Sequence, residues 1–173
     1  MLFRSKFVMP FNSQTFITSA ILKVSDGRPD VVLTNANKDA NKILTFSAAG
    51  TYTIEIIGKF ILISMSASPD KQKLIEINQF GFSTTFHISA FQGCSNLIVK
   101  TTDTINLNSN QGNLFAGIKG FDSAVNLSTW DFSRVSGAAY IFNGVQNPMT
   151  SVPQGFITMA NIDRLYKGSS SSL

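Results

Sequence analysis

The sequence predicts a mainly β fold with a minor helical contribution, in which a small β domain precedes a stack of short repeats. In the strand expected at residues 51–57, residues 51–56 alternate polar and apolar side chains, the period of two that is typical of a half-buried strand. A Phe-x-Gly signature then occurs at Phe91, Phe115 and Phe142, at spacings of 24 and 27 residues. Such self-similarity indicates stacked copies of one unit, which form a scaffold more often than a catalytic cleft.

The first third of the chain reads as strands separated by turns. Residues 1–14 are interpreted as an extended, basic arm and residues 15–65 as a β domain. Asp26-Gly27 is a turn signal after the first strand, and Gly58-Lys59 is expected to end the fourth. The expected strands cover residues 20–24, 30–34, 43–46, 51–57 and 60–65.

Residues 66–166 are interpreted as repeats, each with a short strand, a loop and a tight turn or half-helix that ends in Phe-x-Gly. Strands are expected at residues 74–77, 104–107 and 124–127. The glycine suits a left-handed turn, and the phenylalanine fills the space between neighbouring units. A helix over residues 156–166 would cover the open end, and residues 167–173 form a flexible Gly/Ser tail.

The repeat segment resembles a known family at several motifs. The run Asn126-Leu127-Ser128-Thr129-Trp130-Asp131-Phe132 resembles the strand of BspA-like leucine-rich repeats, and Phe91-Gln92-Gly93-Cys94-Ser95-Asn96-Leu97 resembles their turn. The resemblance covers roughly residues 72 to 156. It implies a short leucine-rich-repeat solenoid whose structural repeat positions are Phe91, Gly93, Cys94, Phe115, Gly117, Trp130, Phe142 and Gly144.

The segment before the repeats is similar to another family. Residues 49–56 resemble the closing strand of a PKD-type immunoglobulin-like sandwich. Residues 23–27 stand where such domains carry a Trp-Gly-Asp-Gly turn, of which this chain has only Asp26-Gly27. Only about 45 residues lie between Phe16 and Phe60, against about 100 in a full sandwich. The resemblance therefore implies a small, truncated Ig-like β-sandwich with open sheet edges.

A PKD-like module followed by BspA-like repeats is similar to proteins of bacteriophage virions and bacterial surfaces. The resemblance implies a non-enzymatic structural or adhesion component of a virion, such as a head fibre, tail fibre or decoration protein. The expected partners are other virion proteins, further copies of the chain (a trimer, for example) and a host-surface glycan or protein. The N-terminus has no apolar export segment, which favours the virion over the alternative of a bacterial surface or secreted adhesin.

The arm contributes the candidate docking residues Arg4, Lys6, Phe7 and Phe11. If the arm docks onto a particle, it should contact a different chain. Folding back onto its own chain would count against that role.

Composition excludes several classes of function. The net charge of +4 is spread along the chain without a basic run, so nucleic-acid binding is not expected. The longest apolar stretch, residues 60–65, is too short for membrane insertion. A single cysteine and a single histidine exclude an intramolecular disulfide and a multi-histidine zinc site.

No catalytic, cofactor-binding or metal-binding residue is predicted. His87 has Ser89 and Asp103 nearby in sequence, but no Gly-x-Ser-x-Gly elbow accompanies them, so a solvent-facing or hydrogen-bonded histidine is favoured. Cys94 is expected to be a small buried hydrophobe rather than a nucleophile. Residues 117–120 lack the spacing of a phosphate loop.

Three alternatives stay open from the residues alone. Trp130 is interpreted as a core residue; the alternative is an exposed platform on which a sugar stacks. Asp26 and Asp30 are interpreted as flanking an ordinary turn; the alternative is that they share a bound cation. A glycan-cleaving enzyme would need paired carboxylates about 5 to 9.5 Å apart, drawn from Asp103, Asp122 and Asp131.

Overall fold

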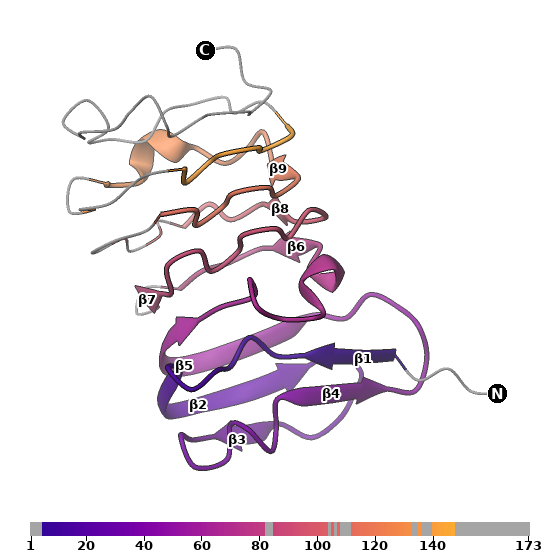
Figure 1. Cartoon of the computed structure of the whole chain (residues 1–173). Helices are drawn as coiled ribbons and strands as arrows, with labels where there is room; N and C mark the ends of the chain where they lie inside the picture. The colour runs from indigo at the N-terminus through magenta and orange to yellow at the C-terminus, as the bar shows by residue number, and fades with distance from the viewer. Residues whose placement is uncertain are drawn as a thin grey trace.

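A computed structural model describes residues 5–81, 85–103, 105, 107, 112–132, 135 and 140–147. These residues form a two-layer β unit at the N-terminal end and, next to it, a series of short coils stacked on one another (Figure 1). The mainly β prediction is confirmed, and the described residues contain no α-helix. The predicted helix at 156–166 and the tail at 167–173 lie outside the described residues.

Two sheets build the β unit. The smaller pairs β1 (Ser5–Val8) with β4 (Ile43–Phe46) in antiparallel register. The larger has the strand order β3-β2-β5-β7. Its strands are β2 (Phe16–Val24), β3 (Val31–Leu33), β5 (Ile54–Ile63) and β7 (Thr85–Phe86). β2 runs antiparallel to β3 and β5, whereas β7 runs parallel to β5.

The length of β5 shows that one predicted strand boundary is wrong. Gly58 was expected to separate two strands, but β5 continues through it. Gly58 has a φ of +137°, and a Cβ atom there would lie 2.3 Å from the Ser19 carbonyl oxygen. Glycine therefore lets β2 approach closely, beside an irregularity in register between Ile17 and Ser19. Gly58, which the sequence predicts to end a strand, is instead a point at which the backbones of β2 and β5 approach closely.

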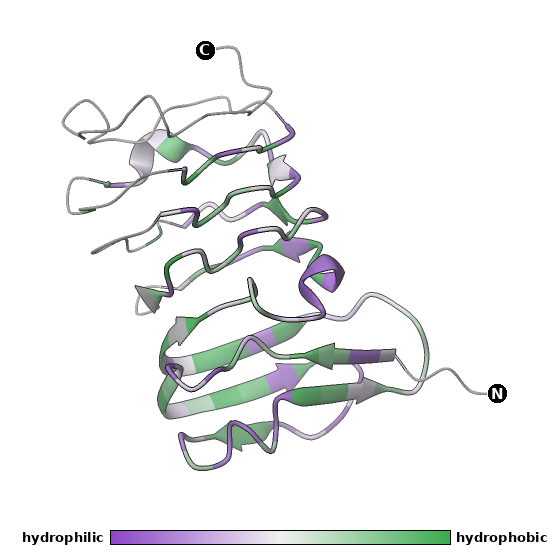
Figure 2. Ribbon diagram, viewed as in Figure 1, coloured by the Kyte–Doolittle hydropathy of each residue, from purple (hydrophilic) through white to green (hydrophobic). Residues whose placement is uncertain are grey.

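The first core lies between the two sheets. Burial alternates along β2 and β4, so each strand turns one apolar face inward. Figure 2 shows mostly hydrophobic residues along β2, β4 and β5, with polar residues in the connecting turns. The buried members are Met9, Phe11, Ile17, Ala20, Leu22, Val24, Leu33, Leu44, Phe46 and Phe60.

The coils share a small parallel sheet with the order β6-β8-β9. Its strands are β6 (Glu76–Ile77), β8 (Ile98–Val99) and β9 (Gly120–Phe121). Glu76 lies beside Ile98, and Ile98 lies beside Gly120, so each coil rests on the preceding one in register. We call the described residues between 74 and 147 the coil stack.

The predicted repeat strands were placed only partly correctly. β6 falls within the strand expected at 74–77. The strand expected at 124–127 is wrong, because a turn there leads into a 3-10 helix, η2 (Leu127–Thr129). Of the strand expected at 104–107, only Ile105 and Leu107 are described, and both are buried outside any strand. A second 3-10 helix, η1 (Lys71–Lys73), precedes the stack.

A column of aromatic rings forms the second core. The rings of Phe91 and Phe115 stack at 5.7 Å with 8° between their planes, and those of Phe115 and Phe142 at 6.1 Å and 5°. Phe7 and Ile63 pack against this core and also against the first. The β unit and the coil stack therefore share side chains at their junction.

Candidate functional site

The predicted repeat positions lie in three equivalent turns, residues 89–94, 113–118 and 140–145, which we call the repeat turns. Gly93, Gly117 and Gly144 have φ values of +75°, +71° and +68°. The Gly93 N–H donates to the Ala116 carbonyl at 2.8 Å, and the Gly117 N–H donates to the Asn143 carbonyl at 2.7 Å. A Cβ on Gly117 would lie 3.8 Å from Gly93, an ordinary contact, so the backbone angle rather than space requires glycine.

A second left-handed position in each turn was missed from the sequence. Ser89, Asn113 and Tyr140 have φ values of 64°, 60° and 63°, and each stands two residues before the stacked phenylalanine. Left-handed backbone is uncommon outside glycine, although asparagine is enriched there. Asn113 was thus the only one of the three with a recognisable signal. Each repeat turn contains two left-handed residues, one before and one after its phenylalanine.

Cys94 is a packing residue. Its side chain is fully buried, and Ile118 and Val145 occupy the same place in the next two turns, also buried. Burial raises the pKa of the Cys94 thiol to about 12, while the charge of nearby Lys71 opposes the shift. The thiolate needed for nucleophilic chemistry is therefore scarce at neutral pH.

Trp130 lies in the second core and is only 1% exposed. Its indole meets the ring of Phe80 edge-on at 5.9 Å and that of Phe121 edge-on at 6.0 Å. A ring enclosed in this way cannot serve as a platform for a sugar. The structure thus favours the core interpretation of Trp130 over ligand contact.

His87, Ser89 and Asp103 have separate structural partners. The Ser89 hydroxyl donates to the Gly112 carbonyl at 3.1 Å. The Asp103 carboxylate accepts the N–H groups of Phe80 at 3.0 Å and of Gly81 at 2.8 Å. The His87 Nδ1 atom lies 2.6 Å from the Ile88 carbonyl oxygen. Within the described ranges no hydrogen bond links the three residues to one another.

Asp26 and Asp30 also belong to different contacts. Two nitrogen atoms of the Arg28 guanidinium bond the Asp26 carboxylate, and this hydrogen bonding lowers the pKa of Asp26. Asp30 lies 3.7 Å from the Lys23 ammonium. The described residues contain no group of three or more His, Cys, Asp and Glu side chains that could hold a metal ion. Nor does this part of the chain contain a helix with the length and apolarity to span a bilayer.

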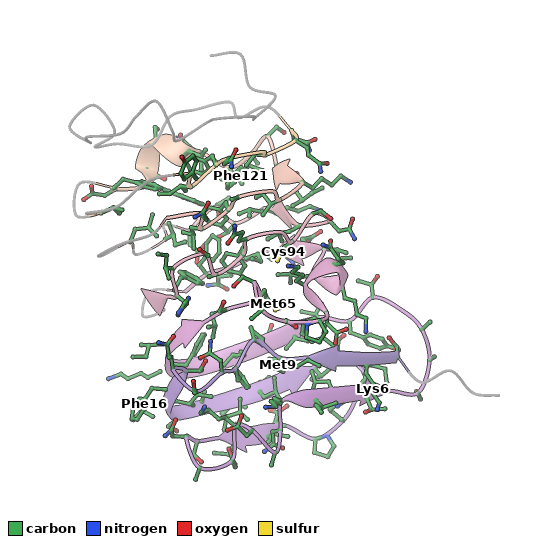
Figure 3. All side chains as sticks on the ribbon, in the orientation of Figure 1. Lys6, Met9, Phe16, Met65, Cys94 and Phe121 are labelled. Carbon is green, nitrogen blue, oxygen red and sulfur yellow. The ribbon has the colours of Figure 1, made fainter. Side chains whose placement is uncertain are left out.

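The described part of the candidate docking arm, residues 5–14, folds back onto its own chain. Arg4 lies outside the described residues. Phe11 is 6% exposed in the first core, Phe7 is partly buried between the two cores, and Lys6 is exposed. Figure 3 labels Lys6 and Met9 on this segment. This placement counts against a docking role for Phe7 and Phe11 and leaves Lys6 at the surface.

Residues 64–73, which join β5 to the coil stack and which we call the connector, bond the other edge of the arm. The Asp70 carboxylate accepts the Val8 N–H at 2.7 Å and lies 2.7 Å from the Lys73 ammonium. Lys73 also donates to the carbonyl of Lys6, and the Ser64 N–H donates to that of Pro10 at 3.1 Å. With β4 on its other edge, the arm lies between two segments and joins the β unit to the coil stack.

A small hollow lies beside the arm. Its volume is about 150 Å³, and its lining is mostly apolar, with Met9, Phe11, Ala67 and Pro69 among the lining residues. Sites for small molecules usually measure about 300–1,000 Å³ and present converging polar groups. This hollow is too small to be assigned as a ligand site.

The outward side of the larger sheet is apolar. Val32, Ile57 and Ile21 are 61%, 50% and 39% exposed. Ile21 stands opposite Val32 on β3 and opposite Ile57 on β5, so the three form a row across three strands. Phe16, the first residue of β2, stands opposite Ile61 on β5, and the two form a second exposed pair. Figure 3 labels Phe16. We call these five residues the outer face.

Comparison with known proteins gives no relative. No protein-family model, no curated protein and no solved structure matches this chain.

Proposed function

We propose that the chain is a non-enzymatic structural or adhesion component of a bacteriophage virion, such as a head fibre, tail fibre or decoration protein. It acts through protein–protein contacts and as a homo-oligomer. In this proposal the β unit is a truncated PKD-like sandwich and the coil stack is a short BspA-like leucine-rich-repeat solenoid. The sequence resemblance, the three equivalent repeat turns and the in-register parallel strands support this interpretation.

The ionisable side chains support a scaffold rather than a reaction centre. Asp26 is bonded to Arg28, Asp70 to Lys73 and Val8, and Glu76 to Lys100 at 2.7 Å. Each of these carboxylates orders a turn, the arm or the small parallel sheet. Catalytic carboxylates instead converge on a common groove.

The observation that carries the proposal is the outer face. An antiparallel sheet with one side on a core usually presents polar residues on its other side. Here three strands present large aliphatic side chains outward instead. Contiguous exposed apolar patches mark interaction sites on soluble proteins. An exposed apolar face of this kind is expected in a protein that assembles with neighbours.

The test is to look for the protein in particles. Phage particles purified from the producing culture would be analysed by peptide mass spectrometry and by labelling with gold-conjugated antibody. We expect the protein at a copy number in fixed ratio to a capsid or tail protein, while an abundant host cytosolic protein is lost during purification. Absence from particles together with recovery from the cell-surface fraction would instead support the bacterial adhesin.

A further inference from the structure

Two opposite charges flank the central residue of the outer face. Glu55 and Lys59 stand two positions before and after Ile57 on β5, and all three side chains are exposed. In the register with β2, Glu55 faces Lys23 and Lys59 faces Ser19, so both charges lie on the outward side beside the apolar row. Lys23 is paired with Asp30. Within the described residues, Glu55 and Lys59 have no ion pair of their own.

We propose that the outer face binds the same face of a second copy, related by a two-fold axis through Ile57. The axis lies in the plane of the interface and perpendicular to the strands. β5 of one copy then runs antiparallel to β5 of the other copy. Ile57 meets the partner's Ile57, and Ile21 and Val32 likewise meet their own copies. Glu55 meets the partner's Lys59, and by symmetry this contact forms twice.

The charges select this arrangement over other face-to-face pairings. An axis parallel to the strands would place Glu55 on the partner's Glu55 and Lys59 on the partner's Lys59. An axis through Lys59 would again bring two ammonium groups together. Like charges in direct opposition suppress a wrong pairing. Only an axis crossing the strands at Ile57 places the row of Ile57, Ile21 and Val32 on its own copy and each unpaired charge on its opposite.

The edge of the sheet is less suited to a partner than its face. The Asn37 side-chain amide donates to the Val32 carbonyl at 2.9 Å, and the Asn37 side-chain oxygen accepts the Thr34 N–H at 2.8 Å. One asparagine thus occupies backbone groups along β3 that an added strand would need. Strand addition at this edge is thereby blocked, as is common for exposed edges.

The size of the face predicts a reversible dimer. Three strands spaced about 4.8 Å apart, with about 3.3 Å per residue, give a footprint of a few hundred Å². Stable complexes commonly bury about 800 Å² on each partner. We therefore expect a dissociation constant of the dimer in the micromolar range. This self-association stands whether or not the protein belongs to a virion, and it replaces the trimer considered from the sequence with a two-fold pair.

Sedimentation velocity over roughly 1–500 μM protein tests the dimer. Wild type should shift from monomer to dimer with concentration. Ile57→Lys places two ammonium groups on the axis and should leave a monomer throughout. Ile43→Lys is the matched control, because Ile43 is 53% exposed on β4, outside the outer face. It should dimerise like wild type, and the thermal unfolding of both variants confirms that they fold.

Charge exchange tests the orientation of the axis. Glu55→Lys and Lys59→Glu should each weaken the dimer by about tenfold or more at low salt, because each variant opposes like charges twice. The double variant E55K/K59E restores opposite charges across the axis and should recover most of the wild-type affinity. The proposal is overturned by a wild-type monomer at all concentrations, by a trimer, by an Ile57→Lys dimer, or by a double variant no better than the single ones.

Discussion

Left-handed backbone residues shape each repeat turn. Gly117 permits this conformation without a Cβ penalty, and Asn113 tolerates it two residues before Phe115. Between them Phe115 is directed into the aromatic column, where it contacts both Phe91 and Phe142. In the Phe-x-Gly signature, the glycine permits the left-handed backbone of the turn, and the phenylalanine packs into the aromatic column.

Gly117→Ala should lower the free energy of unfolding by about 1–2 kcal/mol, because the substitution forces an L residue into left-handed backbone. Space is not the cause, since the new Cβ would meet only ordinary contacts at 3.8 Å. Gly50→Ala is the control, because Gly50 is not left-handed and its Cβ would lie 3.5 Å from the Tyr52 ring. Urea denaturation of the two variants should differ; equal stabilities would contradict the explanation.

The buried Cys94 thiol makes a pH-dependent contribution to stability. Its pKa is raised from 9.0 to about 12 by burial, so the folded chain retains a proton that the unfolded chain loses. This contribution is fully present below about pH 9 and is lost as the pH rises toward about 12. Cys94→Val, which reproduces the residue at the equivalent Val145, should unfold with a shallower decline over this range. Denaturation of both proteins at several pH values checks it, and parallel curves would count against the buried thiol.

At the scale of elements, the arm is part of both structural units. Its strand β1 is paired with β4 on one side and bonded by Asp70 and Lys73 of the connector on the other. Just after β1, the Pro10 carbonyl accepts the Ser64 N–H. A segment bonded on both edges contributes to the stability of what it joins. The arm should therefore exchange its amide protons slowly.

Asp70→Ala should destabilise the protein by about 1–3 kcal/mol, because the Val8 N–H loses its acceptor in a partly buried position. Asp30→Ala is the matched control, since the Asp30 side chain is 55% exposed and its partner Lys23 is 44% exposed, so this pair lies at the surface. That change should stay within about 0.5 kcal/mol. Hydrogen exchange at Val8 gives the local measurement. Unchanged protection in Asp70→Ala would show that the contact does not hold the arm.

The longer strands could be predicted from the sequence, but the short ones could not. β4 and the first part of β5 follow a period of two because one face of each strand packs on a core. β8 and β9 have only two residues each, too few for any period, and β9 begins with glycine. Their pairing depends on the neighbouring coil, which local propensity does not record.

The candidate site was predictable in part. Phe91, Phe115 and Phe142 were recognisable from their spacing, and their stacking follows from it. The outer face was missed, because the sequence alone does not show which side of a strand lacks a covering layer. That Glu55, Ile57 and Lys59 share an uncovered face becomes apparent only when β2 and β3 lie beside β5.

At the scale of the whole molecule, the β unit covers one end of the coil stack. β7 extends the larger sheet by pairing with β5, and Phe7 and Ile63 pack into both cores. Short repeats need such covering because their end units cannot bury their own apolar faces. One side of the larger sheet packs on the first core, and the outer face is on its other side. In the proposed dimer, stability and assembly would therefore use opposite faces of the same sheet.

Zero-length carbodiimide crosslinking of purified particles tests the assembly role most directly. Glu55 and Lys59 lie four residues apart on one extended strand, about 13 Å, so a direct amide between their side chains must join two chains. We predict an interchain Glu55–Lys59 crosslink in particles, identified by peptide mass spectrometry and absent from Lys59→Glu. A protein present in particles without this link would contradict the two-fold pair, and a protein absent from particles would contradict the virion function.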